Sequence, residues 1–170
     1  MTVPLNQSSF NILLEVLNQS NSSTLGTLLA LTATDISITN VTALTVGSIA
    51  NTSALVTTLP GGRLTPGISL TVYYDRLDLS TLFSVTPPSV VMVPESSLDL
   101  LIPLNAQFGL ALDATDILYE LIPVPSTSYT MKALPSSYAY IGQVLVNLIE
   151  PGIDLNLDIT NQFLQGFVTQ

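Results

Sequence analysis

The sequence predicts an α+β fold, mainly β, made of two similar small units in tandem. The 170 residues are 47% hydrophobic and only 9% charged, and Ser, Thr, Asn and Pro interrupt the apolar residues every few positions. Such interruption is typical of short strands. The string LTATDI at 31–36 returns as LDATDI at 112–117. Each unit is expected to be a short helix followed by a β-hairpin or three-stranded sheet.

The first unit is predicted to span residues 1–83. It opens with a helix over Ser8–Asn18, because Ser8 or Ser9 can cap it and an apolar face recurs at helical spacing: Phe10, Leu13, Leu14 and Leu17. Residues 52–59 and 68–74 are β-branched and partly alternating. The turn-forming string PGGRLTPG lies between them. We therefore expect a β-hairpin.

The second unit is predicted over residues 97–155, after a Pro-rich connector at 84–96 that contains three prolines. Its apolar run includes Pro103, so any helix there is expected to be short or to begin near this proline. Residues 156–170 are expected to form a C-terminal strand or arm. The arm could pack on its own chain or anchor it to another.

The two predicted units match beyond the six-residue string. Residues 51–74 align with 126–149 at a constant offset of 75, which pairs Pro60 with Pro135 and Gly67 with Gly142. Upstream, Leu17 and Asn18 correspond to Leu104 and Asn105. Differences in spacing fall within loops, where insertions are tolerated. We interpret this order of matches as a tandem duplication.

The composition excludes several kinds of chemistry. The chain has no His and no Cys, so it has neither an imidazole base nor a thiolate, a disulfide or a Cys-based metal site. Three basic residues face twelve acids, for a net charge of −9, which argues against binding to nucleic acid or to an anionic membrane surface. No stretch approaches the ~18–20 apolar residues of a membrane-spanning helix. We predict no enzymatic activity and no cofactor.

The acidic residues offer few candidate sites. Asp113, Asp116 and Glu120 would share one helical face if their segment were helical, and carboxylates can bind Ca²⁺. The segment lacks a calcium-loop pattern, and acids at the start of a solvated helix explain it without a metal. No metal site is therefore predicted. Asp35 and Asp116, each in the string T-D-I, are interpreted as turn or cap residues.

Four residues are predicted as possible assembly contacts. Arg76 and Asp78 follow a predicted strand, where a local ion pair or a contact between subunits is expected. Phe163 and Phe167 are the aromatic residues of the C-terminal arm.

Three segments carry a family resemblance. They read YYDRLDLSTLF at 73–83, LNAQFGLALDATDI at 104–117 and TMKALPSSYAYIGQVLVNL at 130–148. This chain resembles a domain of uncharacterised virion structural proteins of large tailed bacteriophages, over most of its length. It departs from the family pattern where Gln143 follows Gly142 in place of Ser. The resemblance implies a virion location and supplies no active site.

The predicted function is that of a non-enzymatic structural protein of a tailed bacteriophage particle. It would be a head decoration protein or a component of the neck, tail or baseplate. Its expected partners are other virion proteins, in a homo-oligomer or symmetric array, because scarce charge lowers the desolvation cost of burying subunit surface. The alternative is a host-recognition or adhesive β module of a phage fibre.

Overall fold

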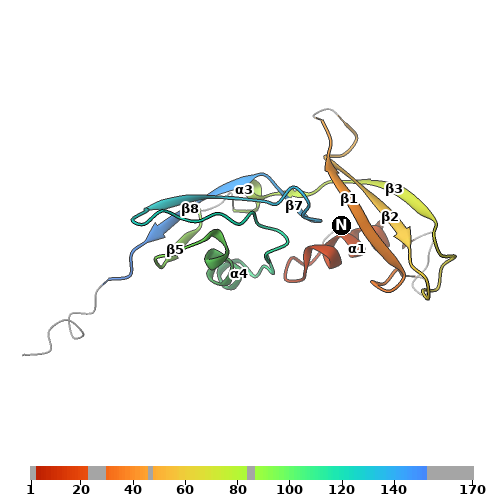
Figure 1. The fold of residues 1–170 in the computed structure, drawn as a ribbon, viewed down its shortest axis with the longest axis horizontal. Coiled ribbons are helices and arrows are strands. Elements are labelled where there is room, and N and C mark those ends of the chain that lie inside the picture. The colour runs from red at the N-terminus through yellow and green to blue at the C-terminus, as the bar shows by residue number, and fades with distance from the viewer. Residues whose placement is uncertain (1–2, 23–29, 46–47, 84–86, 153–170) are drawn as a thin grey trace, which may run out of the picture.

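The computed structural model describes residues 3–22, 30–45, 48–83 and 87–152 of the chain (Figure 1). Strand residues outnumber helical ones within these ranges, so the predicted α+β class with mainly β content is confirmed. The predicted C-terminal strand or arm at 156–170 lies outside the described residues. No helix of the described part is both long enough and apolar enough to cross a membrane.

The first helix, α1 (Ser9–Ser20), forms where the sequence predicts it and ends two residues later. Ser8 is its N-cap, and the Ser8 hydroxyl oxygen accepts a bond of 3.4 Å from the backbone N–H of Asn11. Leu13 and Leu17 are buried on its inner face. The helix thus follows from a polar cap and an apolar stripe.

The first sheet is antiparallel and has the strand order β1-β2-β3. Its strands are β1 (Ile36–Ala43), β2 (Thr52–Thr58) and β3 (Ser69–Tyr74). The predicted hairpin of the second and third strands is confirmed, with Val56 opposite Leu70. Gly67 precedes β3 with a φ of +80°, which a residue with a side chain rarely adopts.

The second sheet is mixed, with strand order β5-β8-β6. Its strands are β5 (Ser89–Val91), β6 (Ser128–Lys132) and β8 (Gln143–Ile149). β5 pairs in parallel with β8, and β6 pairs with it antiparallel. β5 comes from the segment predicted as a connector, 84–96. Residues Ser89–Val91 are extended as expected of this segment, but they belong to a sheet.

The remaining elements are short. Two of them, β4 (Leu77–Asp78) and β7 (Tyr140–Ile141), form a parallel pair that joins the halves of the chain. A 3-10 turn, η2 (Ser97–Leu100), leads into α4 (Leu101–Phe108), whose third residue is Pro103. This helix is short, as its early proline predicts. Another short helical element is α3 (Leu79–Leu82), directly after β4.

The buried apolar residues form two clusters, and α1 contributes to both. Leu13 and Leu17 pack against the first sheet, with Tyr74 of β3. Ile12 belongs to the other cluster, which includes Leu104 of α4 and Val146 of β8. Figure 1 shows α1 lying between α4 and the first sheet. The two sheets are therefore held together by a helix from the N-terminal end of the chain.

Candidate functional site

The first TDI string forms a turn closed by the side chain of Asp35. Its Oδ2 accepts bonds from the backbone N–H of Thr32 at 2.9 Å and from the Thr32 hydroxyl at 2.8 Å. Arg63 Nη2 lies 2.7 Å from the same oxygen, in an ion pair whose arginine side chain is 47% exposed. Hydrogen bonds from Arg63, then from Thr32, hold the pKa of Asp35 far below its usual value. The prediction that Asp35 is a turn residue is confirmed.

The second TDI string, at 115–117, forms a similar turn, but the carboxylate that closes it has a serine as its partner and not an arginine. Oδ2 of the buried Asp116 accepts from the Asp113 backbone N–H at 3.3 Å, and Oδ1 accepts from the Ser137 hydroxyl at 2.7 Å. None of the ion pairs in the described residues involves Asp116. Burial raises the pKa of this carboxyl, against smaller effects of its hydrogen bonds. Its predicted role as a turn residue is confirmed.

The acids considered for metal binding do not converge. Residues 114–116 form a turn, so Asp113, Asp116 and Glu120 do not share a helical face. Glu120 instead accepts bonds from Lys132 Nζ at 2.9 Å and from the Tyr129 hydroxyl at 2.7 Å. These partners, Lys132 first, lower the pKa of Glu120. Across the described ranges, no three acidic side chains lie close enough to hold a metal ion.

Arg76 is buried at the junction of the two halves. Its Nε donates to Thr52 Oγ1 at 2.8 Å, and its Nη1 donates to the carbonyl oxygens of Pro135 and Ser137 at 2.9 and 3.0 Å. Only 4% of the residue is exposed, and burial lowers its pKa. No acid in the described part of the chain pairs with it. Its guanidinium joins two halves of one chain, and its role as an assembly contact stays a prediction.

Asp78, the second predicted contact, caps α3. Its Oδ1 accepts a bond of 2.8 Å from the backbone N–H of Ser80. The carboxylate also lies against Gly142, which has a φ of +75°. Its role in assembly stays a prediction. Phe163 and Phe167, the other two predicted contacts, lie outside the described residues.

An open groove of about 690 Å³ runs between α1 and the link from β3 to β4. Most of its lining is apolar or aromatic: Val3, Leu5, Ile12, Leu13, Val16, Tyr73, Tyr74, Leu77, Tyr138 and Ala139, with Ser20 and Asp75. Within the described residues, the buried hydroxyl of Tyr74 makes no hydrogen bond. The sequence reasoning missed this groove, because its walls come from segments up to 136 residues apart (3 to 139). The alternation that places Tyr74 on an inner strand face was its one visible signal.

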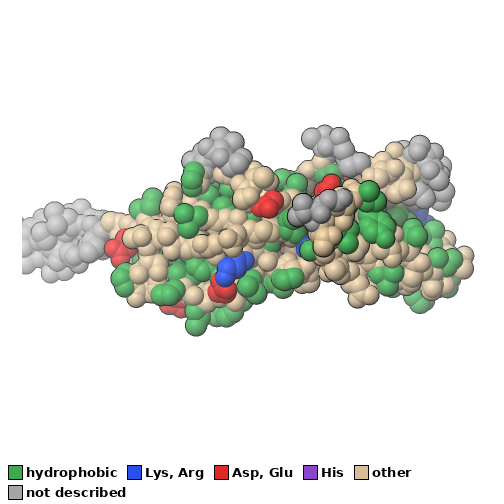
Figure 2. All heavy atoms as spheres, turned by 90° about the horizontal axis from the view of Figure 1, so that it is seen from above, with side chains coloured by type: hydrophobic (Ala, Val, Ile, Leu, Met, Phe, Trp, Pro, Cys, Tyr) green, Lys and Arg blue, Asp and Glu red, His purple; other side chains and the backbone are tan. Residues whose placement is uncertain are grey.

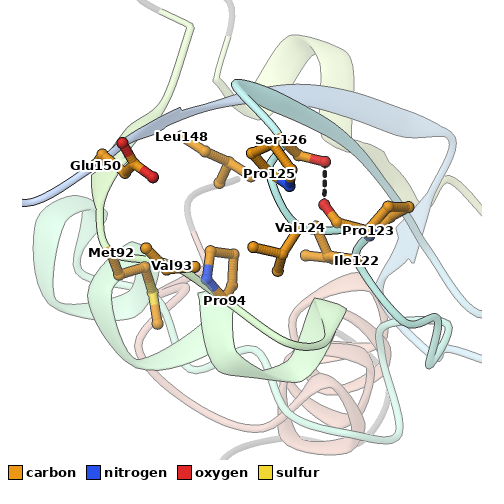
Figure 3. Close-up of a pocket in the computed structure, with 10 residues that line it drawn as sticks. All are labelled: Met92, Val93, Pro94, Ile122, Pro123, Val124, Pro125, Ser126, Leu148 and Glu150. Atoms are coloured by element: carbon orange, nitrogen blue, oxygen red, sulfur yellow. Dashed lines mark hydrogen bonds between the residues drawn. The ribbon is translucent and has the colours of Figure 1, made fainter.

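A second hollow lies at the end of the β5-β8-β6 sheet, between two Pro-containing loops. Figure 3 shows Val93 and Pro94 of one loop facing Val124 of the other. These loops and the adjoining strand ends carry exposed apolar side chains that we call the apolar end: Val91, Val93, Leu121, Val124 and Ile149. Figure 2 shows a surface on which hydrophobic side chains recur and charged ones are few.

The chain can also be placed by comparison with known proteins. No curated protein and no solved structure matches it. A protein-family model, described as a family of unknown function (DUF7941), matches residues 2–169. The match spans nearly the whole sequence, and the chain therefore belongs to the DUF7941 family.

Proposed function

We propose that this chain is a non-enzymatic structural protein of a tailed bacteriophage particle. It acts through protein–protein contacts, as a head decoration protein or as a component of the neck, tail or baseplate. The observation that carries the proposal is the apolar end, a group of exposed aliphatic side chains on two loops and on the adjoining strand ends. The resemblance of three sequence segments to virion structural proteins is the reason for proposing a phage particle.

The apolar end has the chemistry of a protein interface. Leu121 is 70% exposed, Val91 64% and Val124 61%. Large contiguous apolar patches on soluble proteins mark interaction sites, and the centres of interfaces are depleted of charge. Two loops that hydrogen-bond to each other, from Ile122 N to the carbonyl oxygen of Glu95 at 2.8 Å, hold the patch in place. A partner could therefore bury it with little reordering of backbone.

We also infer that the two halves are copies of one ancestral unit. In the first half, the Asn18 side chain bonds both backbone polar atoms of Leu31, at 2.9 and 2.7 Å. In the second half, Asn105 bonds Leu112 in the same way, at 2.8 and 2.9 Å. Each pair leads directly into a TDI turn. The shared arrangement supports a duplication.

The strands that follow each turn support the same inference. The carbonyl oxygen of Asp35 accepts from Leu59 N at 2.9 Å, and that of Asp116 accepts from Leu134 N at 2.7 Å. Leu59 and Leu134 are 75 residues apart, the offset of the sequence alignment. The last strands differ by one residue in register: Ser53 lies opposite Tyr73, whereas Ser128 lies opposite Asn147. The copies therefore share their turns more closely than their outer strands.

The proposal is tested on purified particles. Virions of a phage that encodes the chain are purified through a density gradient, and their proteins are identified by mass spectrometry. We expect the chain at the copy number of a structural protein, with host proteins from the same lysate depleted. Its absence from particles would reject the proposal.

A second arm tests the apolar end. A tagged chain that carries both Val93→Ser and Val124→Ser is supplied during infection. It should enter particles at least tenfold less than the unchanged chain. The control is Ile49→Ser, at a residue that is 91% exposed in the loop between β1 and β2. Equal incorporation of all three chains would contradict a role for the apolar end. Specific binding of the isolated protein to host cells would instead favour the adhesive module.

A further inference from the structure

We propose that the groove between α1 and the β3–β4 link binds the C-terminal segment, residues 153–170, of a second copy of this chain. The inference rests on the proposed function and deepens it, because it names one partner in the assembly. Three observations support it: the lining of the groove, the composition of the segment and the point where the described chain ends.

The groove needs an apolar occupant that also carries hydrogen-bonding groups. Leu77 is 39% exposed and Tyr73 57% exposed on its walls, so an occupant would bury apolar surface there. The hydroxyl of Tyr74, a residue that is 8% exposed, is without a hydrogen bond in the described structure. A buried hydroxyl without a partner costs ~1–3 kcal/mol. The hydroxyl is closed off from solvent, so an occupant would supply a partner only where it displaces the atoms that cover it.

The C-terminal segment has this composition. Its last part, residues 159–170, reads ITNQFLQGFVTQ and contains no charged residue. It offers Phe163 and Phe167 for apolar contact and several amide and hydroxyl side chains for hydrogen bonds. Asp75 is the one charged residue among those that line the groove. An uncharged segment meets that carboxylate without repulsion, whereas the acidic stretch 153–158, with Asp154 and Asp158, would not.

The end point of the described chain favours a second copy over the segment's own groove. β8 starts beside β7 and ends at the far end of its sheet from α1 (Figure 1). The described chain stops at Gly152, shortly after this strand. Eighteen residues follow (153–170) and can span about 60 Å when extended. These residues can reach a second copy placed end to end by continuing in the direction of β8. To reach the groove of their own chain, they would have to turn back along β8.

Such a contact is heterologous, because the groove and the segment are different surfaces. Each copy would offer one groove and one segment, so the contact repeats from copy to copy. It closes into a ring when the rotation allows and otherwise builds an open array. Either outcome is compatible with a particle protein.

Disulfide trapping tests the proposal, since the full chain contains no cysteine. Val16→Cys places a thiol in the groove, and Phe163→Cys places one in the segment. The two full-length variants, one carrying a mass tag, are mixed and oxidised with copper–phenanthroline. We expect a disulfide-linked heterodimer on a non-reducing gel. The control pairs Phe163→Cys with Ile102→Cys, at a residue of α4 that is 81% exposed and does not line the groove, and should give at least tenfold less heterodimer.

The remaining outcomes separate the alternatives. A double variant with both cysteines that is trapped only as a monomer would show the segment in its own groove and overturn the proposal. Heterodimer no more abundant than in the control would also overturn it.

In light scattering, the full chain should associate with rising concentration, and Phe163→Ser with Phe167→Ser should reduce that association. If the chain is present in virions but fails to cross-link, this inference falls while the proposed function stands. If it cross-links but is absent from virions, the proposed function falls.

Discussion

The side chain of Asn105 binds both backbone polar atoms of Leu112. Its Nδ2 donates to the Leu112 carbonyl oxygen at 2.8 Å, and its Oδ1 accepts from the Leu112 N–H at 2.9 Å. Between them the chain leaves α4 through Gly109, which has a φ of +65°. A single amide thus ties the end of a helix to the segment that enters the Asp116 turn.

Asn105→Asp should destabilise the protein by about 1–3 kcal/mol, because a carboxylate cannot donate and the Leu112 carbonyl loses its partner. Urea denaturation followed by circular dichroism measures the loss. Gln107→Glu is the control, since it makes the same chemical change on the exposed side of the same helix. Its effect should stay within ~0.5 kcal/mol. Equal losses in both variants would contradict the role given to Asn105.

Asp35→Asn should cost most stability near neutral pH and progressively less in acid. The folded-state pKa of Asp35 is lowered from its ordinary 3.8, chiefly by Arg63. The ionised carboxylate therefore contributes its full stability above pH ~4, and this contribution is lost progressively as the pH falls from about 4 toward the lower folded-state pKa. Urea denaturation of both proteins between pH 2.5 and 7 checks the trend. A difference that is constant with pH would refute it.

Asp116→Asn should show the opposite trend. Burial raises the folded-state pKa of Asp116 above 3.8, so the unchanged protein loses stability as the pH rises from about 4 toward that higher pKa. The stability of the variant, relative to the unchanged protein, should therefore improve between pH 4 and 7. The same denaturation series measures it. If the stability of Asp35→Asn and Asp116→Asn changed with pH in the same direction, the ion pair that Asp35 has and Asp116 lacks would not explain their pH dependence.

Gly142→Ala should destabilise the protein by more than 2 kcal/mol. An added Cβ would lie 2.5 Å from Oδ1 of Asp78, in addition to the strain of a φ of +75°. Gly67→Ala is the matched control: its φ is +80°, but no atom lies within 4 Å of the added carbon. It should cost only ~1 kcal/mol. Thermal unfolding compares the two, and equal losses would exclude the contact with Asp78 as the cause.

Arg76→Lys should cost about 3 kcal/mol, because an ammonium group cannot reproduce the planar set of bonds to Thr52, Pro135 and Ser137. The same substitution at Arg63, whose side chain is 47% exposed, should cost ~1 kcal/mol or less. Urea denaturation measures both. A smaller loss at Arg76 than at Arg63 would contradict the structural role of the buried guanidinium.

Local signals predicted the local structure. The cap at Ser8 and the apolar stripe containing Leu13 indicated α1, and alternation around PGGRLTPG indicated the hairpin. The parallel pairing of β5 with β8 joins residues 58 positions apart, as between Ser89 and Asn147, and no periodicity encodes such a choice. The extended conformation of Ser89–Val91 was therefore visible from the prolines around it, whereas its place in a sheet was not.

The candidate site was harder to predict than the fold. Arg76 reads as a surface residue beside acids, but its partners are a threonine hydroxyl and carbonyl oxygens up to 64 positions away, at Tyr140. Carbonyl oxygens belong to every residue, so sequence cannot single them out. The groove was equally hard to predict, since Val3 and Tyr138, which both line it, are 135 positions apart in the sequence.

Neighbouring residues of α1 finish in different cores, Ile12 in one and Leu13 in the other. The core of Ile12 also needs Val146 and Leu148, near the end of the described chain. Until these strand residues are in place, the side of α1 that carries Ile12 lacks part of its apolar cover. The folding of the core that holds Ile12 is therefore coupled to a strand more than 130 positions further along the chain.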